Sequence, residues 1–110
     1  MPHRIVRKGT LLISSGSVQH LHIVCNDPVH YPRLDRSAFL CVNISSVPTG
    51  VAFDETCILQ PGDHSFIAHN SFVFYGRADI FGRDTVLAKL EAGEITAHQP
   101  CAEVLFIRVL

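Results

Sequence analysis

Short runs rich in β-branched and aromatic residues alternate along this chain with turn sequences, and this alternation constrains the fold most strongly. The clearest turns are Asn26-Asp27-Pro28 and Pro61-Gly62-Asp63, which combine short polar side chains that bond the local backbone with residues of special backbone geometry. The runs between turns predict strands. We expect strands over residues 10–14, 18–25, 37–47, 54–59 and 71–81, the last being the longest, and a loop over residues 29–36.

A helical pattern appears only near the end of the chain. Residues 85–92 have helical spacing, with Asp84 as the expected N-cap and Gly93 as the expected stop. Pro100 is a favoured first residue for a second helix. Residues 104–110 are also β-branched and aromatic, so periodicity leaves this segment open between helix and strand.

Several short strands separated by turns predict an antiparallel sheet that closes into a small barrel. Residues 1–110 have the length of one domain. Closure or dimerisation protects the edges of such a sheet, and the apolar C-terminal segment would cover the barrel or a second subunit. We therefore expect a mainly β single domain with one or two short C-terminal helices, assembled as a homodimer.

The composition is typical of a folded domain and excludes several classes of protein. Hydrophobic residues make up 47% of the chain and charged residues 17%, which excludes intrinsic disorder. Nine Lys and Arg against ten Asp and Glu argue against a strongly basic surface for duplex DNA. No run approaches the roughly 18 apolar residues of a membrane helix, and none resembles a signal-peptide core. We expect a cytoplasmic protein without membrane contact.

The cysteines carry no sign of redox or zinc chemistry, because no Cys-x-x-Cys pair occurs. Most of them lie inside apolar stretches, where a thiol behaves as a small buried hydrophobe. We expect reduced, buried thiols at Cys25, Cys41, Cys57 and Cys101.

Histidines are the most unusual feature of the composition, since seven occur in 110 residues. His20 and His22 alternate on a predicted strand, so their imidazoles point to the same face. His64 and His69 flank an apolar pair just after a Pro-Gly-Asp turn. The alternative interpretation is structural: each ring is partly buried and donates one nitrogen to a carbonyl or carboxylate.

The order of these residues is also loosely similar to a cupin metal site. That comparison takes His20-x-His22, then an acidic residue, then a later Pro-Gly turn followed by a histidine. Asp27 or Asp63 would supply a carboxylate ligand to a transition metal. Because Asp27 is followed at once by Pro28 rather than by a strand, a metal site is the second alternative, and we expect no cofactor.

Residues 60–69 form the densest cluster of polar and apolar side chains. In a structural interpretation, Asp63 accepts backbone N–H bonds and His64 closes the turn, while Phe66 and Ile67 anchor the segment in the core. In a functional interpretation, His64 and His69 stand at the mouth of a cleft, where histidine suits general acid–base catalysis. The sequence leaves both interpretations open.

The order of elements resembles the MazF/PemK growth-inhibitor toxins over about residues 9–95. Residues 16–19 are similar to that family's Gly-x-x-Gln loop, and the strand ending at Asn26-Asp27 is similar to its strand ending near Ser-Asn-Asp. Residues 42–46 fall where the family has a strand ending Ile-Thr-Ser. The later strand and its following helix correspond to residues 71–80 and 85–92.

A narrower resemblance is to a group of small, uncharacterised bacterial proteins. It rests on Asp54-x-x-Cys57 followed by a Gly-Asp-His-x-Phe-Ile-x-His segment at residues 62–69. This second match carries no known chemistry.

The toxin resemblance implies an SH3-like (PemK-like) barrel, a homodimer, and metal-independent cleavage of single-stranded RNA that an antitoxin opposes. The family's catalytic threonine corresponds best to Ser45. Its Arg-Pro dipeptide has no equivalent here, because residues 19–22 read Gln-His-Leu-His. RNA cleavage needs a base, an acid and a cation, so histidines would have to replace a fixed guanidinium.

Our leading hypothesis is therefore a PemK/MazF-like, toxin-type protein that binds RNA and is a candidate endoribonuclease. The first alternative is a non-catalytic module that binds a peptide or protein, and the second is the cupin-like metal protein. The catalytic candidates are His64, His22 and Ser45. The candidates for substrate contact are Gln19, His20, Asp27, Ser46 and His69.

Overall fold

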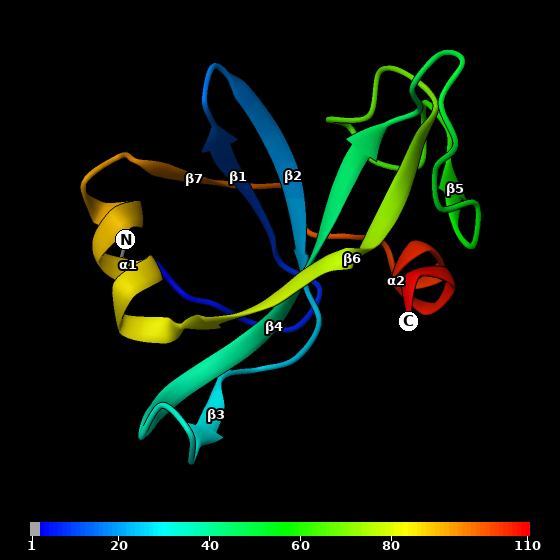
Figure 1. The fold of residues 1–110 in the computed structure, drawn as a ribbon. Helices are drawn as coiled ribbons and strands as arrows, with labels where there is room; N and C mark the ends of the chain where they lie inside the picture. The colour runs from blue at the N-terminus through cyan, green and yellow to red at the C-terminus, as the bar shows by residue number, and fades with distance from the viewer. Residues whose placement is uncertain (1–2) are drawn as a thin grey trace.

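One curled antiparallel sheet dominates the computed structural model, which describes residues 3–110 (Figure 1). Its seven strands in this part of the chain are β1 (Thr10–Ser15), β2 (Val18–Val24), β3 (Val29–Tyr31), β4 (Arg36–Ser46), β5 (Ile58–Leu59), β6 (Ser71–Gly82) and β7 (Ile95–His98). The helices are α1 (Arg83–Glu91) and α2 (Glu103–Val109). The sheet order is β5-β6-β4-β2-β1-β7, with β3 paired to β4. The mainly β class with short C-terminal helices is confirmed.

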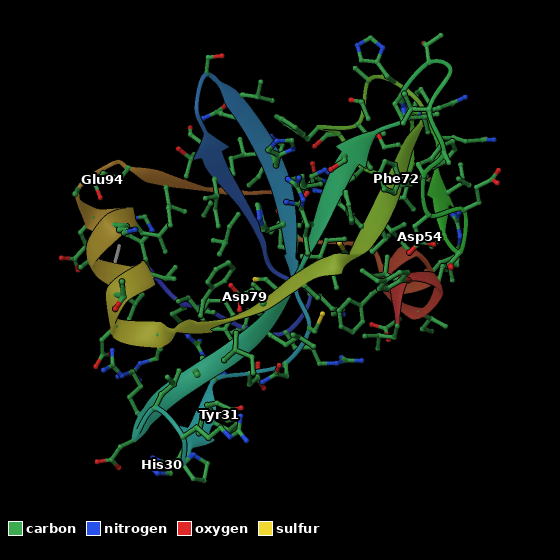
Figure 2. All side chains as sticks on the ribbon, viewed as in Figure 1. His30, Tyr31, Asp54, Phe72, Asp79 and Glu94 are labelled. Atoms are coloured by element: carbon green, nitrogen blue, oxygen red, sulfur yellow. The ribbon has the colours of Figure 1, made fainter. Side chains whose placement is uncertain are left out.

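β4 and β6 are the longest strands and pair along nearly their whole length. Their register shifts between Cys41 and Asn43, and such an irregularity bends a strand and increases its twist. The sheet consequently curls into a half-barrel. The sheet is elongated. His30 and Tyr31, next to the turn of the β3–β4 hairpin, lie at one end of it, and Phe72, near the start of β6, lies at the other (Figure 2).

The sheet carries a hydrophobic core on each face, because neighbouring residues of a strand point to opposite faces. Ile23 belongs to the first core, which α2 covers with Leu105 and Phe106. Val24 belongs to the second core, which α1 covers with Leu90 and its neighbours. The two helices accordingly lie on opposite sides of the sheet (Figure 1). The apolar C-terminal segment thus covers the sheet itself.

The loop expected over residues 29–36 is confirmed only for residues 32–35, since residues 29–31 form β3 and Arg36 begins β4. The residues of β3 pair with residues 36–38 of β4. The prolines that favour a loop, Pro28 and Pro32, lie just outside the paired residues and leave the ladder intact. The side-chain Oδ1 of Asn26 accepts the N–H of Leu40 at 3.0 Å, which bridges the gap between β2 and β3.

Two edge strands also differ from expectation. The strand expected over residues 54–59 shortens to β5, because the Asp54 carboxylate accepts the Thr56 N–H at 2.9 Å and forms a turn there. β7 was not expected at all, and it pairs with Thr10 to Ile13 of β1. Such short strands are stabilised mainly by the strand beside them.

The helices fit the sequence closely except at their starts. Gly82, not Asp84, is the N-cap residue of α1, and Asp84 lies in the first turn. Gly93 ends the helix as expected, with a φ of 79°. The open C-terminal segment is a helix, α2, which begins at Glu103. Neither helix of residues 3–110 could span a bilayer, a crossing that takes about 20 residues.

The cysteines are free thiols, as expected. Three are buried, and Cys25 is half-buried. Burial raises the pKa of Cys101 to about 11 and raises the pKa of Cys41 still further. The Cys41 and Cys101 thiols therefore stay protonated near neutral pH and act as packing groups.

Candidate functional site

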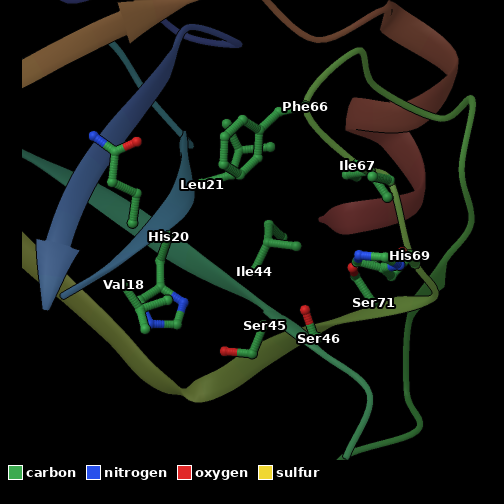
Figure 3. A pocket seen from close by; sticks show the side chains of 12 residues that line it. Val18, His20, Leu21, Ile44, Ser45, Ser46, Phe66, Ile67, His69 and Ser71 are labelled. Atoms are coloured by element: carbon green, nitrogen blue, oxygen red, sulfur yellow. Dashed lines mark hydrogen bonds between the residues drawn. The ribbon is translucent and has the colours of Figure 1, made fainter.

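A cavity of about 280 Å³ lies where β2 and β4 diverge, and we call it the β2–β4 pocket (Figure 3). Three segments line it: the start of β2, the end of β4 and the loop that leads into β6. Its apolar floor includes Leu21, Ile44, Phe66 and Ile67. Its polar lining consists of Gln19, His20, Ser45, Ser46, His69 and Ser71.

The pocket exists because two neighbouring strands change partners. β2 and β4 pair from Val24–Cys41 to Leu21–Ile44 and no further. Beyond that point β2 continues with β1 alone. Ser45 and Ser46 continue with β6 alone. The sheet divides into two arms there, and the pocket occupies the space between them.

The loop below the pocket is held by its own turn, as the structural interpretation of residues 60–69 expects. The Asp63 carboxylate accepts the Gln60 N–H at 2.7 Å. Ile67 is buried in the first core, and its N–H donates to the carbonyl of His64 at 3.0 Å. This part of the prediction is confirmed, and it fixes Phe66 and Ile67 as the floor.

His64 is buried beneath this loop and does not line the pocket. Its Nδ1 accepts the Phe66 N–H at 3.0 Å. Its Nε2 therefore carries the proton and donates to the carbonyl of Gln99 at 2.5 Å. Both ring nitrogens are engaged within the fold, so His64 has no free nitrogen for proton transfer to a ligand.

His22 and Asp27 also lie outside the pocket. His22 is buried, its ring packs near Phe81 with centroids 6.1 Å apart, and burial lowers its pKa. Its Nδ1 lies 3.1 Å from the carbonyl of His20. The Asp27 carboxylate, a candidate for substrate contact, instead accepts the backbone N–H of Arg7 at 2.8 Å. These groups hold local structure together.

The structure thus brings together five of the eight candidate residues. They share the β2–β4 pocket with Ser71, a polar residue that the sequence analysis did not single out. Ser71 is paired with Ser46, and only the long-range register between β4 and β6 reveals that neighbourhood. The five candidates are Gln19, His20, Ser45, Ser46 and His69.

The lining of the β2–β4 pocket contains no Lys, Arg, Asp or Glu among the described residues. Cationic side chains line a different cavity of about 250 Å³, which includes His3, Arg4 and Arg83. There Arg83 is paired with Asp84 at 2.8 Å. The β2–β4 pocket therefore differs from that cavity in having no arginine in its lining.

Within residues 3–110, no three His, Cys, Asp or Glu side chains gather closely enough to hold a metal ion. Comparison with family models, curated proteins and solved structures found no match to this chain. What the chain does must therefore be inferred from the geometry of its pocket.

Proposed function

We propose that this protein is a non-catalytic binding module whose β2–β4 pocket holds a peptide segment of a partner protein. One observation carries the proposal: polar side chains, none of them Lys, Arg, Asp or Glu, surround an apolar floor of Leu21, Ile44, Phe66 and Ile67. At about 280 Å³, the pocket lies just below the roughly 300–1,000 Å³ of small-molecule sites. It suits one or two side chains of a larger ligand.

The charge of the pocket favours a peptide over a nucleic acid. Affinity for RNA comes largely from cations that neutralise phosphates, and no Arg or Lys lines this pocket. Two of the three catalytic candidates, His22 and His64, are buried, and their rings lie within hydrogen-bond distance of backbone carbonyls. These features support binding without cleavage.

RNA cleavage of the MazF/PemK kind is the second candidate, and a separate observation favours it. His20 and His69 both line the β2–β4 pocket, with Ser45 on the same lining. Two histidines can act as acid and base in the cleavage of RNA through its 2′-hydroxyl. This candidate would need a cation from the substrate complex or from a protonated histidine.

The peptide proposal is tested by panning a displayed library of random peptides against the immobilised protein. We expect enriched peptides with a shared apolar residue, whose affinity is then measured by fluorescence anisotropy. Val18→Lys should weaken binding at least tenfold because Val18 lines the pocket. Val51→Lys is the matched control, since Val51 is similarly exposed, 65% against 54%, but lies elsewhere.

The RNA candidate is tested by incubating the protein with single-stranded RNA in EDTA. The peptide proposal expects intact RNA at high protein concentration. Cyclic-phosphate ends that disappear in both His20→Ala and His69→Ala would contradict it and support the nuclease. Failure of any peptide to enrich over a blocked surface would also count against a peptide-binding module.

A further inference from the structure

We infer that the bound peptide is an added β-strand, held between the two arms of the divided sheet by the backbone of Gln19 and Ser46. The inference rests on the proposed function and assigns its binding mode. It follows from the direction of backbone groups in β2 and β4, from the point at which their pairing stops, and from the lining of the pocket.

In β2 the odd-numbered residues direct their backbone groups toward β4. The N–H of Cys25, which follows the strand, donates to the carbonyl of Leu40 at 2.8 Å. The N–H of Val24 donates to Gly9 on the opposite side, at 2.9 Å. Because successive residues of a strand direct these groups to alternate sides, the N–H and C=O of Gln19 point toward the space beside β4.

In β4 the even-numbered residues direct their backbone groups toward β2. Leu40 does so in the bond to Cys25. The N–H of Val47, an odd-numbered residue, donates to Asn70 on the β6 side at 3.0 Å. By the same alternation, the N–H and C=O of Ser46 point toward the space beside β2.

If the register continued, Gln19 and Ser46 would be the next hydrogen-bonded pair after Leu21–Ile44, and that pair does not form. The ladder stops at Leu21–Ile44, while each arm stays paired on its far side to β1 or β6. Both residues are exposed and both line the pocket. Strand edges with free N–H and C=O groups are templates for an incoming extended chain.

The pocket offers different chemistry to the two faces of such a strand. Leu21 and Ile44 lie on the face of the first core, above Phe66. His20 and Ser45 lie on the other face, because they neighbour those residues along the strands. An added strand would bury an apolar side chain against the floor and place its neighbours beside an imidazole and a hydroxyl. The ligand is therefore an extended, uncharged peptide with one apolar anchor.

The experiment uses peptides enriched by panning against the full chain and replaces each backbone N–H in turn with N–CH₃. A strand bonded on both sides predicts that methylation at two adjacent central residues lowers affinity at least tenfold each. Methylation near the peptide ends should change affinity less than threefold. Binding that tolerates every N-methyl group but depends on side chains would overturn the inference and leave the proposed function standing.

Proline variants test the same bonds from the protein side. Ser46→Pro removes the N–H that faces β2 across the β2–β4 pocket. It should bind at least tenfold more weakly than Ser46→Ala, which removes the pocket-lining hydroxyl but keeps that N–H. Gln19→Pro and Gln19→Ala form the same pair on β2. Equal affinity of the proline and alanine variants would overturn the inference. If a proline variant fails to unfold cooperatively, the N-methyl series decides. The absence of any enriched peptide removes the proposed function and this inference with it.

Discussion

The hydroxyl of Tyr75 donates a hydrogen bond to the backbone carbonyl of Val109 across 2.5 Å and thereby joins β6 to the last turn of α2. The neighbouring Arg108 strengthens this junction, because its Nη2 donates to the carbonyl of Ile58 at 2.9 Å. Burial, together with the nearby Cys57 thiol, raises the pKa of Tyr75 to about 12. The C-terminal helix is consequently fixed to the strand pair beside the pocket.

Tyr75→Phe should lower the free energy of unfolding by about 1 kcal/mol, since it removes one partly buried hydrogen bond and leaves the Val109 carbonyl without its donor. Urea denaturation measures the change. Tyr31→Phe is the control, because the Tyr31 hydroxyl bonds to no other residue among 3–110. Equal stability of Tyr75→Phe and the wild-type protein would contradict the assigned role.

Tyr75 also predicts a loss of stability at alkaline pH. Its pKa is about 12 in the folded protein and about 10 when unfolded, so the unfolded chain loses the proton first. The stabilisation is complete below pH 10 or so and disappears as the pH rises toward 12. The stability advantage of the wild-type protein over Tyr75→Phe should shrink across this interval. A constant difference between the two proteins would count against it.

His22 predicts a loss of stability on the acid side. Burial lowers its pKa below the usual value near 6.5, so the unfolded chain takes up a proton that the folded chain resists. The free energy of unfolding should fall as the pH drops below about 6.5, and His22→Gln should reduce this slope. Urea midpoints measured near pH 7 and pH 5 test it. An unchanged slope in His22→Gln would contradict this role of the His22 imidazole.

His64→Ala should cost about 1–3 kcal/mol of stability, because the Phe66 N–H and the Gln99 carbonyl lose their buried partner. Thermal or urea unfolding measures the loss. His69→Ala is the comparison: His69 is exposed, so its stability should stay within about 0.5 kcal/mol of wild type. A His64→Ala variant that keeps wild-type stability but changes ligand binding would contradict a structural role for this histidine.

Gly93→Ala should lower stability by about 1 kcal/mol, since Gly93 has a φ of 79° and a Cβ is unfavourable there. The N–H of Glu94 donates to Lys89 and the N–H of Gly93 to Leu90, which is the glycine-dependent helix end that the sequence predicts. Gly93→Asn should lose less stability than Gly93→Ala because asparagine adopts this conformation more readily. The reverse order in urea denaturation would exclude this explanation.

The fold was predictable where a local pattern carried it. β4, β6 and α1 follow from β-branched runs, turn sequences and a helix stop at Gly93. β3 and β7 could not be predicted from a local pattern, because each has only a few residues and depends on its partner strand. β3 pairs with Ala38 and its neighbours in β4, and β7 pairs with β1. A short strand of that kind has no pattern of its own.

The candidate site was only partly predictable, for a different reason. The alternation of side chains along β2 predicts which face of the sheet His20 occupies, but it does not predict which histidines are buried and which line the pocket. Both ring nitrogens of His64 form hydrogen bonds with backbone groups, whereas His69 lines the pocket. The pocket itself depends on where the pairing of β2 with β4 stops, which is at Leu21–Ile44. That register joins residues far apart in the chain and leaves no local trace.

The two hydrophobic cores have unequal consequences for the β2–β4 pocket. Leu21 and Ile44, at the pocket floor, pack in the same core as Phe106 of α2, whereas α1 closes the other core. Transient detachment of α2 therefore loosens the pocket directly, while fraying of α1 leaves it in place. Hydrogen exchange in α2 and ligand affinity should accordingly vary together across a series of variants. The C-terminal helix therefore supports the β2–β4 pocket from below, although it contributes no residue to the lining of that pocket.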